Sequence, residues 1–284
     1  MAGMATALNA DLHSHSTRSD GTLEPAALAR RAHANGVQLW ALTDHDDVGG
    51  IAAAATAAAE CGLRFLPGVE ISVSVAAQTV HIVGLGVDAD NAVLCDGLQQ
   101  VRVGRELRAR RMADELEREA GVVDAYTGAC RHAGNPALIS RTHFARYLVE
   151  QRVCSSTHEV FTRFLTPGKP GYVDHAWATL RDALTWIGAA GGHAVIAHPA
   201  RYPFTSTEEW ALFEAFKAMG GAAVEVVTAS HGAAEMRKYA ALAAEFGLRA
   251  SRGSDFHSPH ESRCDLGRLP PLPDGVAPVW ELFD

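Results

Sequence analysis

Short apolar runs alternate with amphipathic stretches from the beginning of the chain. Apolar runs bounded by turn residues predict buried strands, and apolar residues at helical spacing predict amphipathic helices. These criteria predict helices at residues 25–35 and 51–61 and strands at residues 8–13, 37–43, 64–70, 71–75 and 79–87, with a tight turn at Ala77 and Gln78. Strands that alternate with helices indicate a mostly parallel sheet, either open or closed into a barrel.

The same alternation returns in the last part of the chain. It predicts helices at residues 179–190, 208–219 and 233–246 and strands at residues 194–197, 222–227 and 248–253. Residues 101–169 interrupt the pattern, because they have helical character throughout and no run that predicts a buried strand. We interpret this segment as an inserted helical cap. Residues 1–100 and 170–284 then form one α/β domain, which a chain of 284 residues is long enough to build.

The composition is typical of a folded, enzyme-sized protein, with 48% hydrophobic and 20% charged residues. No apolar run approaches the roughly 20 residues of a membrane helix, and residues 1–9 lack the basic flank and apolar stretch of a signal peptide. The five cysteines never form a CxxC pair, which argues against a disulfide framework and against thiolate metal sites. We therefore expect a cytoplasmic protein without membrane contact, and no obligate protein partner is evident.

The charge distribution favours a small anionic substrate. The net charge of −8 would repel a long polyanion unless positive charge is gathered locally. Such a local excess occurs in the second half of the cap, where only Glu150 and Glu159 oppose six cations: Arg131, Arg141, Arg146, Arg152, Arg163 and Lys169. This pattern is typical of a phosphate-binding lid. For any single arginine, a solvated helix face is an equal alternative.

Metal-ligand side chains follow successive predicted strands. His13 and His15 end the first strand, and their spacing of two places both imidazoles on the same side of an extended backbone. Asp20 follows in a loop that can turn back over them. Because functional groups gather at the carboxyl ends of parallel strands, we add the other histidines and carboxylates at strand ends or beside them: His45, Glu70, His81, His198, Asp255 and His257. A lone histidine is more often structural, but joint placement favours a metal site.

The chemistry of these residues restricts the metal. Imidazole and carboxylate without thiolate suit Zn²⁺, Mn²⁺, Fe²⁺ or Co²⁺ rather than Ca²⁺. A glutamate that bridges two ions would give a clustered site able to clamp a phosphoryl group. We expect three further carboxylates, Asp11, Asp44 and Asp46, to act around the ligands by orienting imidazoles or moving protons.

These motifs together resemble those of the PHP (polymerase and histidinol phosphatase) family: Asp11-Leu12-His13-Ser14-His15, Ser19-Asp20-Gly21, Thr43-Asp44-His45-Asp46, Gly68-Val69-Glu70, Ala197-His198-Pro199 and Gly253-Ser254-Asp255-Phe256-His257. The resemblance covers nearly the whole chain except the cap. It implies a distorted (β/α)₇ barrel, similar to the amidohydrolase barrel, with two or three divalent ions. The metal preferred by resemblance is Mn²⁺, and the alternatives are Zn²⁺ and Fe²⁺. The implied groups are His13, His15, Glu70 and Asp255; Glu70, His81 and His198; and Asp20, His45 and His257.

The cap resembles that of a stand-alone bacterial branch of this family, on the stretches at residues 139–148 and 164–173. Members of this branch hydrolyse nucleoside 3′,5′-bisphosphates such as pAp to the 5′-monophosphate, and some trim short RNA from its 5′ end. By resemblance we prefer the bisphosphate phosphatase. The alternatives are a 5′-3′ exoribonuclease, a histidinol phosphatase, a deacetylase and a non-catalytic metal-binding module. For RNA, the cap offers only four aromatic residues, and their spacing is more typical of a helix core: Phe144, Tyr147, Phe161 and Phe164.

A substrate with two phosphates needs fixed cationic donors at some distance from the metals. The candidates are Arg141, His143 and Lys169, because guanidinium binds phosphate in two-pronged fashion and lysine supplies a point charge. Ser140 either adds a hydroxyl or caps the following helix, and Arg201 either reaches the same pocket or is a surface residue. We expect a metal-bridging hydroxide to attack the 3′-phosphorus. The sequence does not identify the general acid.

Overall fold

The computed structural model describes residues 8–284, so most of the opening segment considered for a signal peptide lies outside the described residues. One seven-stranded sheet runs in chain order from β1 to β7. The strands are β1 (Ala10–Asp11), β2 (Leu39–Leu42), β3 (Arg64–Val75), β4 (Gln78–Leu85), β5 (His193–Ile196), β6 (Ala223–Thr228) and β7 (Arg249–Gly253).

The sheet curls into a nearly closed barrel. The first and last strands meet just beyond their ends, where the Leu12 amide donates to the Arg252 carbonyl at 2.9 Å and the Asp255 amide donates to the His13 carbonyl at 2.9 Å. Strand β4 runs antiparallel to both β3 and β5, whereas all other pairs are parallel. This reversed strand distorts the barrel, and the expected distorted seven-stranded barrel is confirmed.

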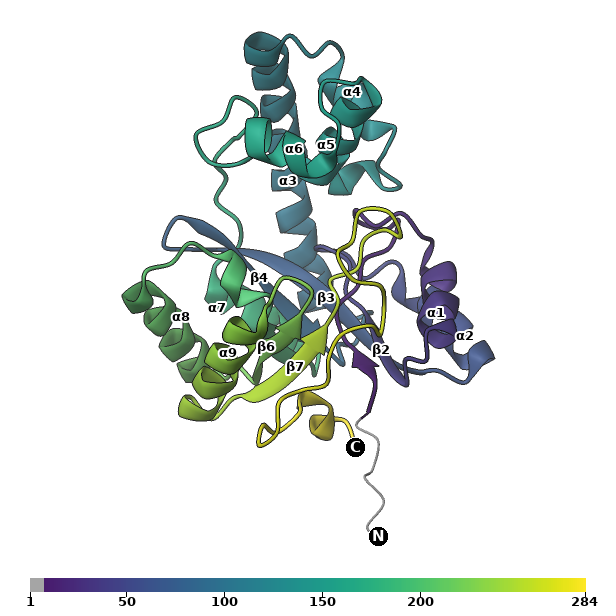
Figure 1. Cartoon of the computed structure of the whole chain (residues 1–284), viewed down its shortest axis with the longest axis vertical. Coiled ribbons are helices and arrows are strands. Elements are labelled where there is room, and N and C mark those ends of the chain that lie inside the picture. Colours follow the sequence, from purple (N-terminus) through teal and green to yellow (C-terminus); the bar gives the residue numbers. More distant parts are fainter. Residues whose placement is uncertain (1–7) are drawn as a thin grey trace.

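The helices that follow the strands cover the outside of the barrel (Figure 1). Helices α1 (Pro25–Ala34) and α2 (Ile51–Cys61) lie side by side against one part of the wall, and α7 (Leu180–Ala189), α8 (Ser206–Ala218) and α9 (Ala233–Glu245) cover another. Each buries an apolar face; in α7 this face is Leu180, Ala183, Leu184 and Ile187. Strands such as β2 (Leu-Trp-Ala-Leu) are apolar on both faces, because they are buried between these helices and the barrel interior.

The hairpin of β3 and β4 corrects one expectation. Residues 64–75 form a single strand, not two, and β3 pairs with β4 from Gly68 opposite Leu85 to Val75 opposite Gln78. Glu70 had suggested a strand end, but its backbone continues the ladder while its side chain enters the barrel. The turn lies at Ala76 and Ala77, one residue earlier than expected, and both have positive φ angles of 47° and 60°.

The inserted helices stand above one end of the barrel (Figure 1). They are α3 (Ala92–Ala120), α4 (Ala125–Cys130), α5 (Arg141–Glu150) and α6 (Thr157–Val160), which continues as a π-helical turn at Phe161–Leu165. The first turns of α3 pack on the barrel through Leu94 and Leu98, and its later turns join the separate core of the cap. The expected boundary at residue 101 therefore falls inside one continuous helix, which links the cap firmly to the barrel.

Two observations concern the character of the chain as a whole. Within the part of the chain that the structure describes, no helix combines the length and the apolar character needed to cross a membrane. The five cysteines are all free, and only Cys154 is fully buried.

Candidate metal centre

The structure brings together all nine side chains expected as metal ligands, at the end of the barrel that faces the cap. They come from the ends of β1, β2, β5 and β7, from the middle of β3 and β4, and from the loop after β1: His13, His15, Asp20, His45, Glu70, His81, His198, Asp255 and His257. Seven different elements thus contribute to one buried cluster.

Glu70 lies at the centre of the cluster. Its two oxygens approach five imidazoles: Oε1 lies 3.0 Å from His81 Nδ1, 3.0 Å from His198 Nε2 and 3.2 Å from His13 Nε2, and Oε2 lies 2.9 Å from His45 Nδ1 and 3.3 Å from His15 Nε2. A carboxylate surrounded in this way can bridge ions held by different histidines. The carboxylate is completely buried.

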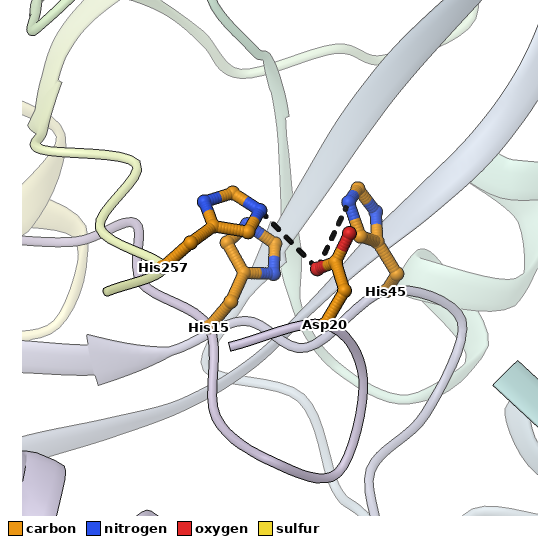
Figure 2. A group of neighbouring side chains, drawn as sticks. All are labelled: His15, Asp20, His45 and His257. Atoms are coloured by element: carbon orange, nitrogen blue, oxygen red, sulfur yellow. Dashed lines mark ion pairs between the residues drawn. The ribbon is translucent and has the colours of Figure 1, made fainter. Parts of the chain in front are cut away.

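The side chains form three overlapping groups whose ligand atoms lie within 4.8 Å of one another: His13, His15 and Glu70; His45, Glu70 and His81; and His15, Asp20, His45 and His257. Figure 2 draws the last group, in which Asp20 Oδ1 lies 3.2 Å from His257 Nε2 and 3.8 Å from His45 Nε2. The grouping differs from the implied one in three ways. Asp255 and His198 belong to none of the three groups, although Asp255 Oδ1 lies 3.2 Å from His15 Nε2 and His198 Nε2 lies 3.0 Å from Glu70 Oε1. His15 also faces the third group, and His45 also reaches Glu70.

The polar atoms of the cluster fit cations better than they fit one another. Among residues 8–284, five cluster atoms are buried without a hydrogen-bond partner: His15 Nδ1, Asp20 Oδ1, His45 Nδ1, Glu70 Oε2 and His81 Nδ1. His45 Nδ1 and Glu70 Oε2 are only 2.9 Å apart, yet their geometry does not make a hydrogen bond. Orphaned buried atoms are rare in proteins and often mark an ion. Imidazole and carboxylate donors without thiolate suit Mn²⁺, Zn²⁺ or Fe²⁺.

The electrostatics keep the carboxylates ionised. Burial opposes the charge of Glu70, but the neighbouring imidazoles of His81, His13 and His45 outweigh it and hold the pKa of Glu70 well below its usual range. Burial likewise opposes the charge of Asp20, and the imidazoles of His257 and His45 outweigh it and hold the pKa of Asp20 well below its usual range. Ionised, buried carboxylates need positive charge close by, which divalent ions would supply.

The imidazoles divide into charged and neutral forms. Burial and the positive charge of His257 and His45 lower the pKa of His15 to about 3. Burial also disfavours the charged form of His257, but Asp20 and Asp255 outweigh it and raise the pKa of His257 to about 9. Metal binding requires neutral imidazoles, so a bound cation would displace the proton from an imidazole whose pKa is raised, such as that of His257.

Two ligands have strained backbones. His198 has a φ of 29° and precedes Pro199, and Asp255 has a φ of 52° in the turn after β7. Left-handed conformations of non-glycine residues cost about 1–3 kcal/mol each and occur most often at functional sites. Both side chains lie within the cluster: Asp255 Oδ1 is 3.2 Å from His15 Nε2, and His198 Nε2 is 3.0 Å from Glu70 Oε1.

The roles expected for three carboxylates are corrected. Asp11 accepts hydrogen bonds from the Ser254 and Gly267 amides, Asp44 accepts them from Ser16 and Ser19, and Asp46 accepts them from Ser72 and from Arg105 Nε at 2.6 Å. None of these bonds reaches an imidazole. Asp11 and Asp44 therefore fix loops that carry ligands, and Asp46 joins the loop after β2 to β3 and to α3.

Glu225 performs the role that had been expected of those carboxylates. It lies on β6 and is buried; its Oε1 lies 2.7 Å from His13 Nδ1, and its Oε2 accepts from the His198 amide at 2.6 Å. The only signal in the sequence is a single charged residue within the apolar strand 222–227. A carboxylate on the outer nitrogen of an imidazole fixes its orientation and makes it a better ligand.

We expect the substitution Glu225→Gln to weaken metal binding by about tenfold, as is typical when such an outer partner is lost. Glutamine keeps the size of the side chain but loses the charge that favours His13 as a ligand. Metal affinity is measured by titration of the metal-free protein, and excess Mn²⁺ should restore activity. Unchanged affinity would mean that Glu225 serves only to hold the backbone of His198.

A cavity of about 660 Å³ extends from the metal ligands to the cap. Three of the five residues expected to bind substrate line it: Ser140, Arg141 and Arg201. Of the two roles considered for Ser140, the structure shows the cap of α5, and the Ser140 Oγ also donates to Asp20 Oδ2 at 3.1 Å. Arg201 Nη2 lies 2.5 Å from Asp255 Oδ2.

The other two candidates lie outside the cavity wall. His143 is buried within the cap, where its Nδ1 accepts from the Ser140 amide at 3.0 Å and completes the cap of α5. Burial lowers the pKa of His143 to about 4, so the ring is neutral. Lys169 is exposed on a turn after the π-helical segment. The sequence alone did not show that His143 caps a helix or that Lys169 lies on an exposed turn, because neither role has a sequence signal that separates it from phosphate binding.

Sequence reasoning also missed two arginines of α3. Arg105 and Arg108 line the cavity and stack on Trp177, with guanidinium carbons 4.8 Å and 5.5 Å from a Trp177 ring centroid. Arg105 is held by Asp46. Arg108 donates to the Val173 carbonyl at 3.1 Å and, among the described residues, forms no ion pair. Both lie in a long helix with many charges, so the sequence could not single them out.

The chain is similar to known proteins over nearly its whole length. The model of the PHP domain family matches residues 11–209. A 3′,5′-nucleoside bisphosphate phosphatase of Chromobacterium violaceum is 50% identical over 272 residues, which cover 96% of this chain and 95% of the relative. A 5′-3′ exoribonuclease of Haemophilus influenzae is 42% identical, with 96% and 98% covered. The solved structure of an amidohydrolase from Chromobacterium violaceum, with bound SO₄ and no metal, superposes with a TM-score of 0.93 at 50% identity, covering 96% and 95%.

Proposed function

This chain belongs to the PHP domain family, and we propose that it is a metal-dependent phosphatase. Its substrates are nucleoside 3′,5′-bisphosphates such as pAp, from which it removes the 3′-phosphate to give the 5′-monophosphate and inorganic phosphate. The 50% identical phosphatase from Chromobacterium violaceum, matched over nearly the full length of both chains, supports this activity. The arrangement of cations in the cavity supports the substrate class.

The observation that carries the proposal is a pair of guanidiniums without carboxylate partners in the described chain. Arg108 is buried, Arg141 is half-buried, and both line the cavity. Burial, together with the charges of Arg141 and Arg105, lowers the pKa of Arg108 to about 9. Burial is also the main cause that lowers the pKa of Arg141. Unpaired buried charges are costly, so these two residues are suited to a dianion that neutralises both.

The same cavity would place the other end of such a substrate at the metal ligands. The nine ligands would hold two or three divalent ions, and we infer Mn²⁺ as the native metal. Ions at this place would supply Lewis acidity, which polarises the phosphoryl group and offsets its charge. Arg201, next to Asp255, lies where its guanidinium can donate to the same phosphate.

Aromatic side chains in the same cavity suit a nucleoside. Trp177 and Phe161 line the cavity beside the arginines, and Arg141 lies 5.7 Å from the ring centroid of Phe161. An aromatic face can stack on a base without selecting its identity. We infer that these two residues hold the nucleoside while the arginines hold its 5′-phosphate.

A 5′-3′ exoribonuclease is the second candidate, because the Haemophilus influenzae relative with that activity is 42% identical. The same cation pair would hold the 5′-phosphate of an RNA end. Of the four cap aromatics considered for stacking, Phe144, Tyr147 and Phe164 belong to the core of the cap, and Phe161 alone among the four lines the cavity. A short stacking platform favours a mononucleotide over an oligonucleotide.

The free cysteines fit a reducing compartment, so we infer a cytoplasmic enzyme. Its partner is then a small nucleotide, with short RNA as the alternative.

We expect the Mn²⁺-loaded protein to release phosphate from 3′,5′-pAp at least about tenfold more efficiently than from 5′-AMP or histidinol phosphate, because only pAp fills both ends of the cavity. The four substrates, including a short 5′-phosphorylated RNA, are assayed side by side with a His13→Ala control. Nucleotide release from the RNA at comparable efficiency would make the protein primarily an exoribonuclease. No turnover with Mn²⁺, Zn²⁺ or Fe²⁺ would contradict the catalytic function.

A further inference from the structure

Arg146 of the cap contacts two loops of the barrel at once. Its Nε and Nη2 donate to the carboxylate of Glu261, at 3.0 Å and 2.7 Å, and its Nη2 also donates to the backbone carbonyl of Asp20 at 2.8 Å. The side chains of Arg146 and Glu261 are only 9% and 26% exposed. A bidentate ion pair that is shielded from solvent fixes the positions of its two side chains more strongly than an exposed ion pair does.

Each of these two loops carries a ligand of the third metal group, His15, Asp20, His45 and His257. Asp20 is itself a ligand. Glu261 precedes Ser262, whose Oγ accepts from the His257 amide at 2.8 Å and from the Ser258 amide at 3.0 Å. The loops are also joined to each other, since the Thr22 amide donates to the His257 carbonyl at 2.8 Å. Arg146 therefore holds both sides of one group.

Two further contacts bring the cap onto the loop after β1. Ser140, at the beginning of α5, donates to the carboxylate of Asp20 at 3.1 Å. A Cβ at Gly134 would lie 2.3 Å from the carbonyl oxygen of Thr17, so only glycine allows this close approach. The third group thus has cap residues on one side, whereas His13 and His198 are held from within the barrel by Glu225.

We propose that Arg146 is a positioning residue that couples the cap to the third metal group. It sets the distance between Asp20 and His257, so that these two ligands can hold an ion together with His15 and His45. The cap then has a second role beside that of a phosphate-binding lid, because its docking completes one of the metal sites. This inference rests on the metal centre of the proposed function, but not on the identity of the substrate.

The test compares Arg146→Ala and Arg146→Lys with a matched control, Arg118→Ala. Arg118 is also a cap arginine paired with carboxylates, Glu115 and Glu119, but it is exposed and remote from the cavity lining. Lysine can keep one contact of Arg146, but it cannot form the bidentate hydrogen bonds to Glu261 and the bond to the Asp20 carbonyl at the same time. Ions per chain are measured by mass spectrometry after dialysis against buffered Mn²⁺, and kcat and KM for pAp are measured at limiting and at excess Mn²⁺.

We expect Arg146→Ala to bind the most weakly held ion about tenfold less tightly than the wild type, and so to lose about one ion per chain at limiting Mn²⁺. Its kcat should fall at limiting Mn²⁺ and recover at excess Mn²⁺, with KM nearly unchanged, and Arg146→Lys should lie between. Arg118→Ala should match the wild type.

Equal ion content in Arg146→Ala and the wild type would overturn the inference and leave the proposed function intact. Loss of all ions together, with a lower unfolding temperature of the metal-free protein, would also overturn it, because Arg146 would then serve general stability. A wild-type protein that binds no ions would contradict the proposed function itself.

Discussion

Replacing Glu70 with glutamine is expected to lower kcat/KM for pAp by about 10³-fold, because metal ions supply several kcal/mol of catalysis and each 1.36 kcal/mol is about tenfold in rate. Glu70 is the residue around which the cluster is built, with five imidazoles within 3.3 Å of its carboxylate. Glutamine has nearly the same volume, so the change removes the negative charge and the bridging oxygen without opening a cavity. The ions held by different histidines would then lose their shared ligand.

The measurement combines kcat/KM with metal content per chain. Glu60→Gln provides the control, since Glu60 is an exposed glutamate at the end of α2 and the same chemical change there should have no effect. Circular dichroism of the metal-free proteins establishes that both variants are folded. Full metal content together with more than about a tenth of the wild-type activity in Glu70→Gln would show that Glu70 is not the shared ligand.

Local sequence patterns predicted most of the secondary structure. The helix expected at residues 51–61 begins and ends as predicted, because Gly62 stops an alanine-rich segment with a φ of 70°. The strand at β3 was harder, since its continuity depends on pairing with β4 and not on its own residues. A charged residue in an apolar strand ordinarily marks an end, and only the barrel interior explains why Glu70 does not.

Ligands were predictable because they share a place in the fold. Most of them follow the carboxyl ends of parallel strands, which converge whatever lies between them in the sequence. Glu70 and His81 are the exceptions, because they lie in the middle of β3 and β4. Glu225 was not predicted as a site residue, because it contacts His13 instead of belonging to the ligands and has no motif of its own. Asp44 and Asp46 were expected to orient imidazoles because they flank His45 in the sequence. Their side chains bind Ser16 and Ser72 instead, since adjacency in the sequence does not determine where a side chain points.

The second-phosphate residues were predicted less well, because they depend on how the cap docks. Arg141 and His143 are two residues apart on α5, so they face different directions: Arg141 faces the cavity, and His143 turns inward to cap its own helix. Arg108 comes from α3, far from the predicted cationic segment. Its contribution depends on tertiary packing against Trp177 and Val173.

Arg141→Met is expected to lower kcat/KM for pAp by about 100-fold, because truncation of one partner of an enclosed charge pair costs about 3 kcal/mol. Methionine keeps an unbranched apolar stem and removes only the charged head. The effect should depend on the 5′-phosphate: 3′-AMP, which lacks it, should be hydrolysed by the variant and the wild type with nearly equal kcat/KM. The ratio of the two substrates therefore isolates the contribution of the cation from any effect at the metals.

Stability gives an independent check on the same variant. The charge of Arg141 helps to lower the pKa of Arg108, and in the described chain neither residue has a carboxylate partner, so repulsion between the two guanidiniums destabilises the substrate-free protein. We expect Arg141→Met to have an unfolding temperature equal to or above that of the wild type, together with its loss of pAp hydrolysis. Arg163→Met is the control, because Arg163 is a cap arginine in an exposed ion pair with Glu159. It should leave kcat/KM for pAp and for 3′-AMP unchanged. If Arg141→Met lost activity toward pAp and 3′-AMP to the same extent, Arg141 would act on the metal end, and the second-phosphate site would have to lie elsewhere.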